Sequence, residues 1–130
     1  MRIVYDDAMQ RTVVKLVDDF MSRLRLNMKQ VVKYDYGMER VQRVEVKARL
    51  NEFLKHQYME VGNTVTHAHG IGNNCQYPVY YHAENEIQQC ANININSGMY
   101  GEVYVSVEDY NGKRVSKSYE LTRHGITVLR

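Results

Sequence analysis

Tryptophan is absent from this chain, and its 130 residues include one proline and two cysteines. Two cysteines cannot build the disulfide framework of a small secreted domain, so we expect free thiols. No apolar run reaches the roughly 18 residues that cross a bilayer, and the N-terminus has no apolar signal core. These absences predict a protein that does not enter a membrane and works in a cytoplasm, that of its own cell or of a host.

An excess of one charge is also lacking, because 17 Lys and Arg face 15 Asp and Glu, a net charge of +2. So weak a charge does not by itself indicate a nucleic-acid partner. Hydrophobic residues make up 44% and charged residues 25%, a composition typical of globular proteins. The chain is long enough to form one hydrophobic core without support from disulfide bonds or metal ions. We therefore expect one domain over residues 1–130, helical over 1–60 and mainly β over 61–130.

The helical part shows two amphipathic stretches. Apolar residues of the first step by three or four along the chain: Met9, Val13, Leu16, Phe20, Leu24, Met28 and Val31. Asp6 or Asp7 can cap its start, and Gly37 is the expected break. A second helix is predicted over residues 38–59, with an apolar arc wide enough to be covered on more than one side.

The period changes to two in the second half, which predicts strands. Pro78 lacks a backbone donor, so its strand should start there or lie at an edge. Asn111-Gly112 predicts a type I′ hairpin turn, because both residues tolerate a positive φ. The expected strands cover residues 64–71, 77–82, 92–96, 103–108, 114–121 and 126–129. Together these patterns predict an α+β fold, with two long N-terminal helices packed on an antiparallel sheet of four to six strands.

Residues 83–96 fit two patterns. As a helix, Ala83, Ile87 and Ala91 share a face, and as a strand Ile87, Ala91 and Ile93 do. We favour a short helix over residues 83–91, followed by an extended run.

His82-Ala83-Glu84 is followed about twenty residues later by the strand sequence Val103 to Glu108. Over residues 80–112 this pattern resembles the zinc-dependent cytidine and deoxycytidylate deaminase superfamily. The resemblance implies that His82 is a zinc ligand and Glu84 the general acid/base that carries protons for a zinc-bound water. The Pro-Cys-x-x-Cys motif of that family is missing, and residues 109–113 read as a hairpin turn where the family begins a helix.

Three histidines and two cysteines fall within 24 residues: His67, His69, Cys75, His82 and Cys90. His67 and His69 point to the same face if they lie on a strand. Three histidines on one face can hold zinc or divide the acid and base roles of RNA cleavage. A solvated strand face explains the same residues without chemistry. The pattern indicates no cofactor, although it leaves zinc open.

Basic residues form a ridge on the second predicted helix, where Arg40, Arg43 and Lys47 follow helical spacing. Such a ridge can track a phosphate backbone, and it can equally be the solvated side of the helix. Tyrosines crowd the β part, among them Tyr80 and Tyr104. Tyrosine buries area while keeping a polar end, which suits a binding surface.

The function favoured by these features is that of a small interaction module that binds, and can inhibit, a macromolecular partner through a sheet face rich in Tyr and Asn. A protein partner is preferred, with nucleic acid possible through the basic ridge, and a homodimer is also compatible with the two helices. The alternative is an enzyme acting on nucleotides or nucleic acid, deaminase-like or a histidine-dependent ribonuclease. Its catalytic residues would be His82, Glu84, His67 and His69.

Overall fold

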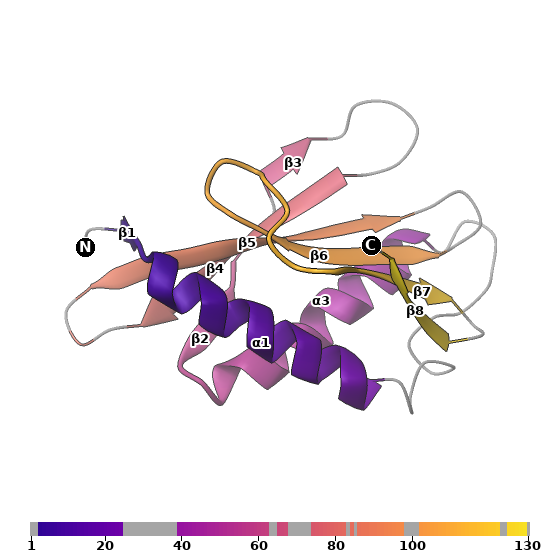
Figure 1. The fold of residues 1–130 in the computed structure, drawn as a ribbon, viewed down its shortest axis with the longest axis horizontal. Helices are drawn as coiled ribbons and strands as arrows, with labels where there is room; N and C mark the ends of the chain where they lie inside the picture. Colours follow the sequence, from indigo (N-terminus) through magenta and orange to yellow (C-terminus); the bar gives the residue numbers. More distant parts are fainter. Residues whose placement is uncertain are drawn as a thin grey trace.

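Two helices lie on one side of a twisted sheet in the computed structural model (Figure 1). The structure describes residues 3–24, 39–62, 65–67, 74–82, 84, 86–97, 102–122 and 125–129. The helices are α1 (Asp7–Leu24) and α3 (Glu39–Lys55). The strands are β1 (Ile3–Tyr5), β2 (Met59–Val61), β3 (Val65–His67), β4 (Asn74–His82), β5 (Ile87–Ser97), β6 (Val103–Glu108), β7 (Ser118–Thr122) and β8 (Gly125–Leu129). The α+β prediction is confirmed.

The sheet follows the order β2-β4-β5-β6-β7-β8, and every neighbouring pair on this path is antiparallel. Two further strands attach beside the path: β3 pairs antiparallel with β4, and β1 pairs parallel with β5. The sequence pattern did not predict β1. A three-residue strand is too short to show a period, and only its pairing with residues 87–89 of β5 defines it.

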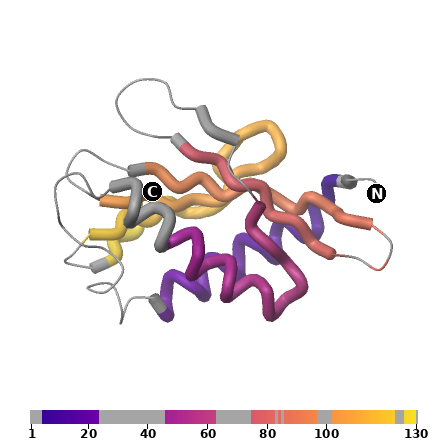
Figure 2. Tube along the Cα trace, turned by 180° about the vertical axis from the view of Figure 1, so that it is seen from behind, coloured from indigo at the N-terminus to yellow at the C-terminus, as the bar shows by residue number. Residues whose placement is uncertain are grey.

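Figure 2, a view from behind, shows both helices on the same side of the sheet. Their apolar side chains belong to the buried core. The side chain of Asp6 caps α1 as predicted, because its Oδ1 accepts from the backbone N–H groups of Ala8 at 2.9 Å and Met9 at 3.2 Å. The core between helices and sheet is apolar and includes Val13, Val17 and Met21 of α1, Val46, Leu50 and Leu54 of α3, Ile93 and Ile95 of β5, and Val103, Val105 and Val107 of β6.

The second helix ends earlier than predicted, at Lys55 and not at residue 59. Tyr58 adopts a positive φ of 59° and donates its N–H to the carbonyl of Lys55 at 3.1 Å, which closes the helix. Residues 59–61 then form β2 and pair with β4. The predicted continuation of the first helix beyond Leu24 falls outside the described residues.

The helix predicted for residues 83–91 is wrong where the structure describes it, because β5 begins at Ile87. Val79 pairs with Ala91 and Tyr80 with Gln89, so Cys90 is an extra residue in β5. This β-bulge leaves the consecutive residues Cys90 and Ala91 both buried. Two adjacent buried residues break the period of two, and this explains why the sequence favoured a helix.

Pro78 lies in the middle of β4, not at its start. Its carbonyl accepts from the N–H of Gly62 at 2.7 Å, so its backbone faces the side of β4 that carries β2 and β3. Gly62 directly follows β2, and β3 begins only at Val65. The donor that proline lacks would therefore point toward Gly62, so Pro78 removes one hydrogen bond at the end of the β2–β4 ladder.

The hairpin turn between β6 and β7 lies where Asn111-Gly112 predicted it, with a different geometry. Gly112 has a φ of 83°, whereas Asn111 does not have a positive φ. The carbonyl of Asp109 accepts from Gly112 at 3.0 Å, and the N–H of Asp109 donates to Lys113 at 2.8 Å, as in a three-residue loop with a glycine bulge. The Asp109 carboxylate also accepts from the backbone N–H groups of Asn111 and Lys113. These bonds favour this turn over type I′.

Candidate binding face

The side of the sheet that faces away from α1 and α3 carries polar and aromatic residues. Strand register puts them there: Asn94 lies between Gln76 of β4 and Ser106 of β6, and Asn96 lies beside Tyr104. Their neighbours along each strand point to the apolar core, as the alternation of a strand requires. We call this surface the Tyr/Asn face and define it by Gln76, Tyr80, Asn92, Asn94, Asn96, Tyr104, Ser106, Glu108 and Glu120.

Hydrogen bonds hold the side chains of the Tyr/Asn face in place. The hydroxyl of Tyr104 donates to the Glu120 carboxylate at 2.9 Å across neighbouring strands. Gln76 Nε2 donates to Glu108 Oε1 at 2.8 Å. Burial and the bond to Glu120 raise the pKa of Tyr104, so its hydroxyl remains a donor throughout the physiological range. The face therefore presents fixed polar groups.

The side chain of Asn94 and the Oδ1 atom of Asn96, both on β5, are shielded from water although they face away from the helices. Asn94 is only 5% exposed. The Oδ1 atom of Asn96 is buried and has no hydrogen-bond partner within the described part of the chain. A buried acceptor without a donor costs about 1 to 3 kcal/mol.

His82 ends β4, and its Nε2 atom lies 2.8 Å from Oε1 of Glu60 on β2. Both side chains are 47% exposed. Sequence reasoning did not select Glu60, because the pairing of β2 with β4 brings it in from 22 residues upstream. Glu84 is exposed and lies in the connection to β5.

The backbone positions of His67 and His82, two members of the predicted histidine cluster, lie far apart. His67 pairs with Asn74 at the first residue of β4, and His82 is the last residue of that strand. At about 3.3 Å per residue the two positions are roughly 26 Å apart. His69 falls outside the described residues. Within the described ranges, no three His, Cys, Asp or Glu side chains are grouped closely enough to hold a metal ion.

Both cysteines are free thiols buried in the core. Desolvation, assisted by the charge of Asp6, raises the pKa of Cys90 from 9.0 to about 11. The folded protein thus favours the neutral thiol, and this preference adds to the free energy of unfolding. The contribution is complete below about pH 9 and is lost as the pH rises through about 11.

We expect the free energy of unfolding to fall by about 2 to 3 kcal/mol between pH 8 and pH 11 through this thiol alone, since one pKa unit corresponds to about 1.4 kcal/mol. Urea unfolding at both pH values measures the loss. Cys90→Ala is the control. Over the same pH range its stability should fall by about 2 to 3 kcal/mol less than that of the wild type. The loss that remains in both proteins comes from Tyr104 and Tyr119, whose pKa values are also raised. Equal losses in the two proteins would contradict the assignment.

The basic ridge predicted at Arg40, Arg43 and Lys47 lies on α3. Lys47 is partly buried, and the side chains of Arg40 and Arg43 fall outside the described part. Of the predicted binding residues, the structure therefore brings Tyr80 and Tyr104 to one face of the sheet, on β4 and β6. Lys47 belongs to a helix that packs on the opposite face.

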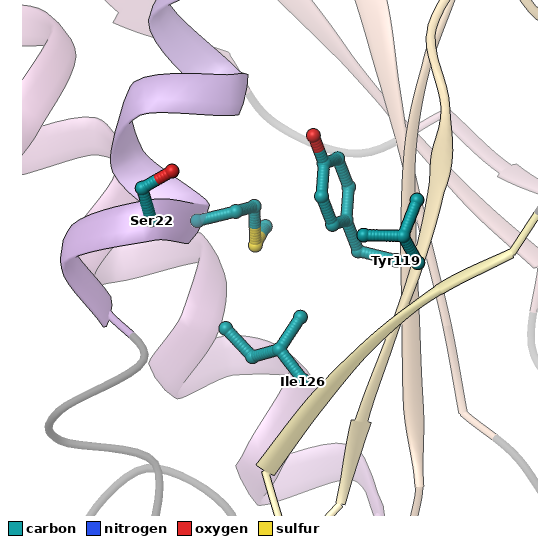
Figure 3. A pocket seen from close by; sticks show the side chains of 5 residues that line it. Ser22, Tyr119 and Ile126 are labelled. Atoms are coloured by element: carbon teal, nitrogen blue, oxygen red, sulfur yellow. The ribbon is translucent and has the colours of Figure 1, made fainter.

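One pocket lies between the end of α1 and strands β7 and β8 (Figure 3). It has a volume of about 140 Å³ and is lined by Met21, Ser22, Tyr119, Ile126 and Val128. The Tyr119 hydroxyl donates to the Asp18 carboxylate, and burial together with this bond raises the pKa of Tyr119. The pocket is smaller than the roughly 300 Å³ at which ligand sites begin. It suits one apolar side chain better than a metabolite.

Comparison of the chain with protein-family models, with curated proteins and with solved structures found no match. Neither helix in the described ranges is both long enough and apolar enough to cross a membrane.

Proposed function

We propose that this chain is an interaction module that binds a protein partner through the Tyr/Asn face and can inhibit that partner. The observation that carries the proposal is the gathering of tyrosine, asparagine and glutamine side chains on the side of the sheet that faces away from α1 and α3. Tyrosine is enriched at protein interfaces because it contributes area and one hydrogen bond at low entropic cost. The bonds from Tyr104 to Glu120 and from Gln76 to Glu108 lower that cost further.

Charge favours a protein over a nucleic acid as the partner. The Tyr/Asn face contains the carboxylates Glu108 and Glu120, and its defining residues include no lysine or arginine. Binding of a phosphate backbone depends on basic side chains that release counterions. An acidic, amide-rich surface opposes such contacts and suits the polar backbone and side chains of a protein surface.

The test is co-purification with the tagged full chain from cells that produce it. The proposal expects a protein to be recovered near stoichiometric amounts, and expects the double substitution Tyr80→Ala with Tyr104→Ala to remove it. Recovery of no protein at that level, or equal recovery by the double variant, would contradict the proposed function.

A second candidate function is acid–base catalysis at His82. The carboxylate of Glu60 lies 2.8 Å from His82 Nε2, and this contact can orient the imidazole. Glu84 lies two residues further along the chain. This arrangement supports an enzyme that acts on nucleotides or RNA, of the deaminase-like or ribonuclease type.

For this enzyme we expect His82→Ala and Glu84→Gln each to abolish cytidine deamination or RNA cleavage while changing the melting temperature little, because exposed ion pairs contribute only about 0 to 1 kcal/mol. Assays of purified protein on cytidine and on single-stranded RNA measure the activity. Glu60→Gln should lower the rate less than His82→Ala does. Full activity in both the His82 and the Glu84 variant would remove this candidate.

A further inference from the structure

Strand β8 (Gly125–Leu129) forms one end of the sheet in Figure 1. Among the described strands it pairs only with β7, through all five of its residues. The outer side of an edge strand presents N–H and C=O groups that can pair with another chain. Natural proteins usually protect such an edge with charges, proline, short strands or a covering element.

The opposite end of the sheet has such protection, whereas within the described part of the chain β8 has none. Strand β2 is three residues long, and the N–H of Val61 donates to Oδ1 of Asn51 on α3 at 2.9 Å, so the helix satisfies one donor of this edge. Strand β3 is also three residues long. Strand β8 has five residues with no charged side chain and no proline, and its Val128 is 49% exposed.

We propose that β8 pairs antiparallel with β8 of a second copy of this chain, joining two sheets into one. The sequence around Thr127 is compatible with itself across such a two-fold axis. Thr127 would lie opposite Thr127 of the partner subunit, a favourable cross-strand pair. Ile126 would lie opposite Val128 of the partner subunit, so apolar residues meet on one side of the ladder.

The apolar side of this ladder adjoins the pocket at the end of α1 (Figure 3). Ile126 pairs with Leu121, and Val128 pairs with Tyr119, whose side chains are buried toward the helices. Both β8 side chains therefore face the helix side, where they line the pocket with Met21. A second copy would cover the exposed part of Val128 and close this margin of the pocket.

The residues of β8 itself introduce no repulsion between charges into a self-paired ladder. Residues 125–129 bring no like charges together, because none is ionisable. Glu120 is the neighbour of Thr127 on β7, and it would be separated from its symmetry mate by three strand spacings, about 14 Å. The Debye length at physiological ionic strength is about 8 Å, so this repulsion is largely screened.

The interface is small. A ladder of five residue pairs with a few side-chain contacts is less extensive than the roughly 1,200 Å² at which stable interfaces begin. We therefore expect a reversible dimer whose population rises with concentration. The two-fold axis would stand perpendicular to the joined sheet, so the Tyr/Asn faces of both copies would lie on the same side. The dimer does not depend on the proposed function of that face.

Analytical ultracentrifugation of the full chain over a concentration series tests the proposal. The wild type should pass from monomer to dimer, and Val128→Lys should weaken self-association at least roughly tenfold by placing a charge in the ladder. Gln57→Lys adds the same charge on the exposed turn after α3 and should leave the dimer unchanged. A monomer at every concentration, or a dimer unaffected by Val128→Lys, would overturn the proposal and leave the edge to another occupant.

Thiol cross-linking tests the register without removing the apolar contact. Thr127→Cys puts two thiols next to each other across the two-fold axis, so a short bismaleimide should link the subunits rapidly. Gln57→Cys is the matched exposed control and should react slowly between subunits. The native cysteines are buried and do not compete. Equal cross-linking of the two variants would contradict pairing through β8 even if a dimer forms.

Discussion

Val105→Asp is expected to prevent the chain from folding. Val105 is fully buried on the helix side of β6 and pairs with Ile95 and Tyr119. A carboxylate at this position would lose water without gaining a donor, and the valine packing would be lost as well. We expect a destabilisation of at least about 4 kcal/mol, close to the total stability of a marginal domain, which begins near 5 kcal/mol. Circular dichroism and urea unfolding measure it.

Ser106→Asp is the matched control, because the same charge enters the next residue of the same strand. Ser106 lies on the Tyr/Asn face and is partly exposed, so the new carboxylate stays hydrated. Its cost should remain within about 1 kcal/mol. A shift of one residue in strand register exchanges the two faces. Tolerance of Val105→Asp together with unfolding by Ser106→Asp would therefore show that the register of β6 is wrong.

Local patterns in the sequence predicted those parts of the fold that depend on neighbours along the chain. The cap at Asp6, the apolar side of α1 and the alternation of β6 all follow from residues a few positions apart. The failures occur where partners distant in sequence decide the structure. The bulge at Cys90 is defined by its pairing with β4, and β1 exists only through its pairing with β5.

The sequence likewise predicted individual residues of the candidate site but not the partners that they contact. Tyr80 and Tyr104 could be chosen as binding residues from strand composition, and alternation places each on one side of its strand. Their partners could not be chosen. Glu120 reaches Tyr104 through the pairing of β6 with β7, and Glu60 reaches His82 through the pairing of β2 with β4. These contacts join residues 16 and 22 positions apart, which no periodicity relates.

Removing both rings with Tyr80→Ala and Tyr104→Ala is expected to raise the Kd for the protein partner roughly a thousandfold. Each tyrosine that an interface buries can contribute about 2 kcal/mol, and about 4 kcal/mol in total corresponds to three factors of ten. The substitutions lie on the face that points away from α1 and α3, so the apolar core is retained. Isothermal titration with the partner recovered by co-purification measures the affinity, and the melting temperature verifies folding.

Tyr58→Ala distinguishes specific binding through the Tyr/Asn face from nonspecific binding through any exposed tyrosine. Tyr58 is 75% exposed in the turn after α3, and it belongs to no strand of the Tyr/Asn face. If any accessible tyrosine sufficed, this variant would lose as much affinity as the double variant does. Tyr104→Phe removes only the hydroxyl that donates to Glu120. Its ring still fills the interface, but the freed carboxylate now needs another donor, so we expect a loss of about tenfold. A Tyr58 variant as defective as the double variant would place the binding surface elsewhere.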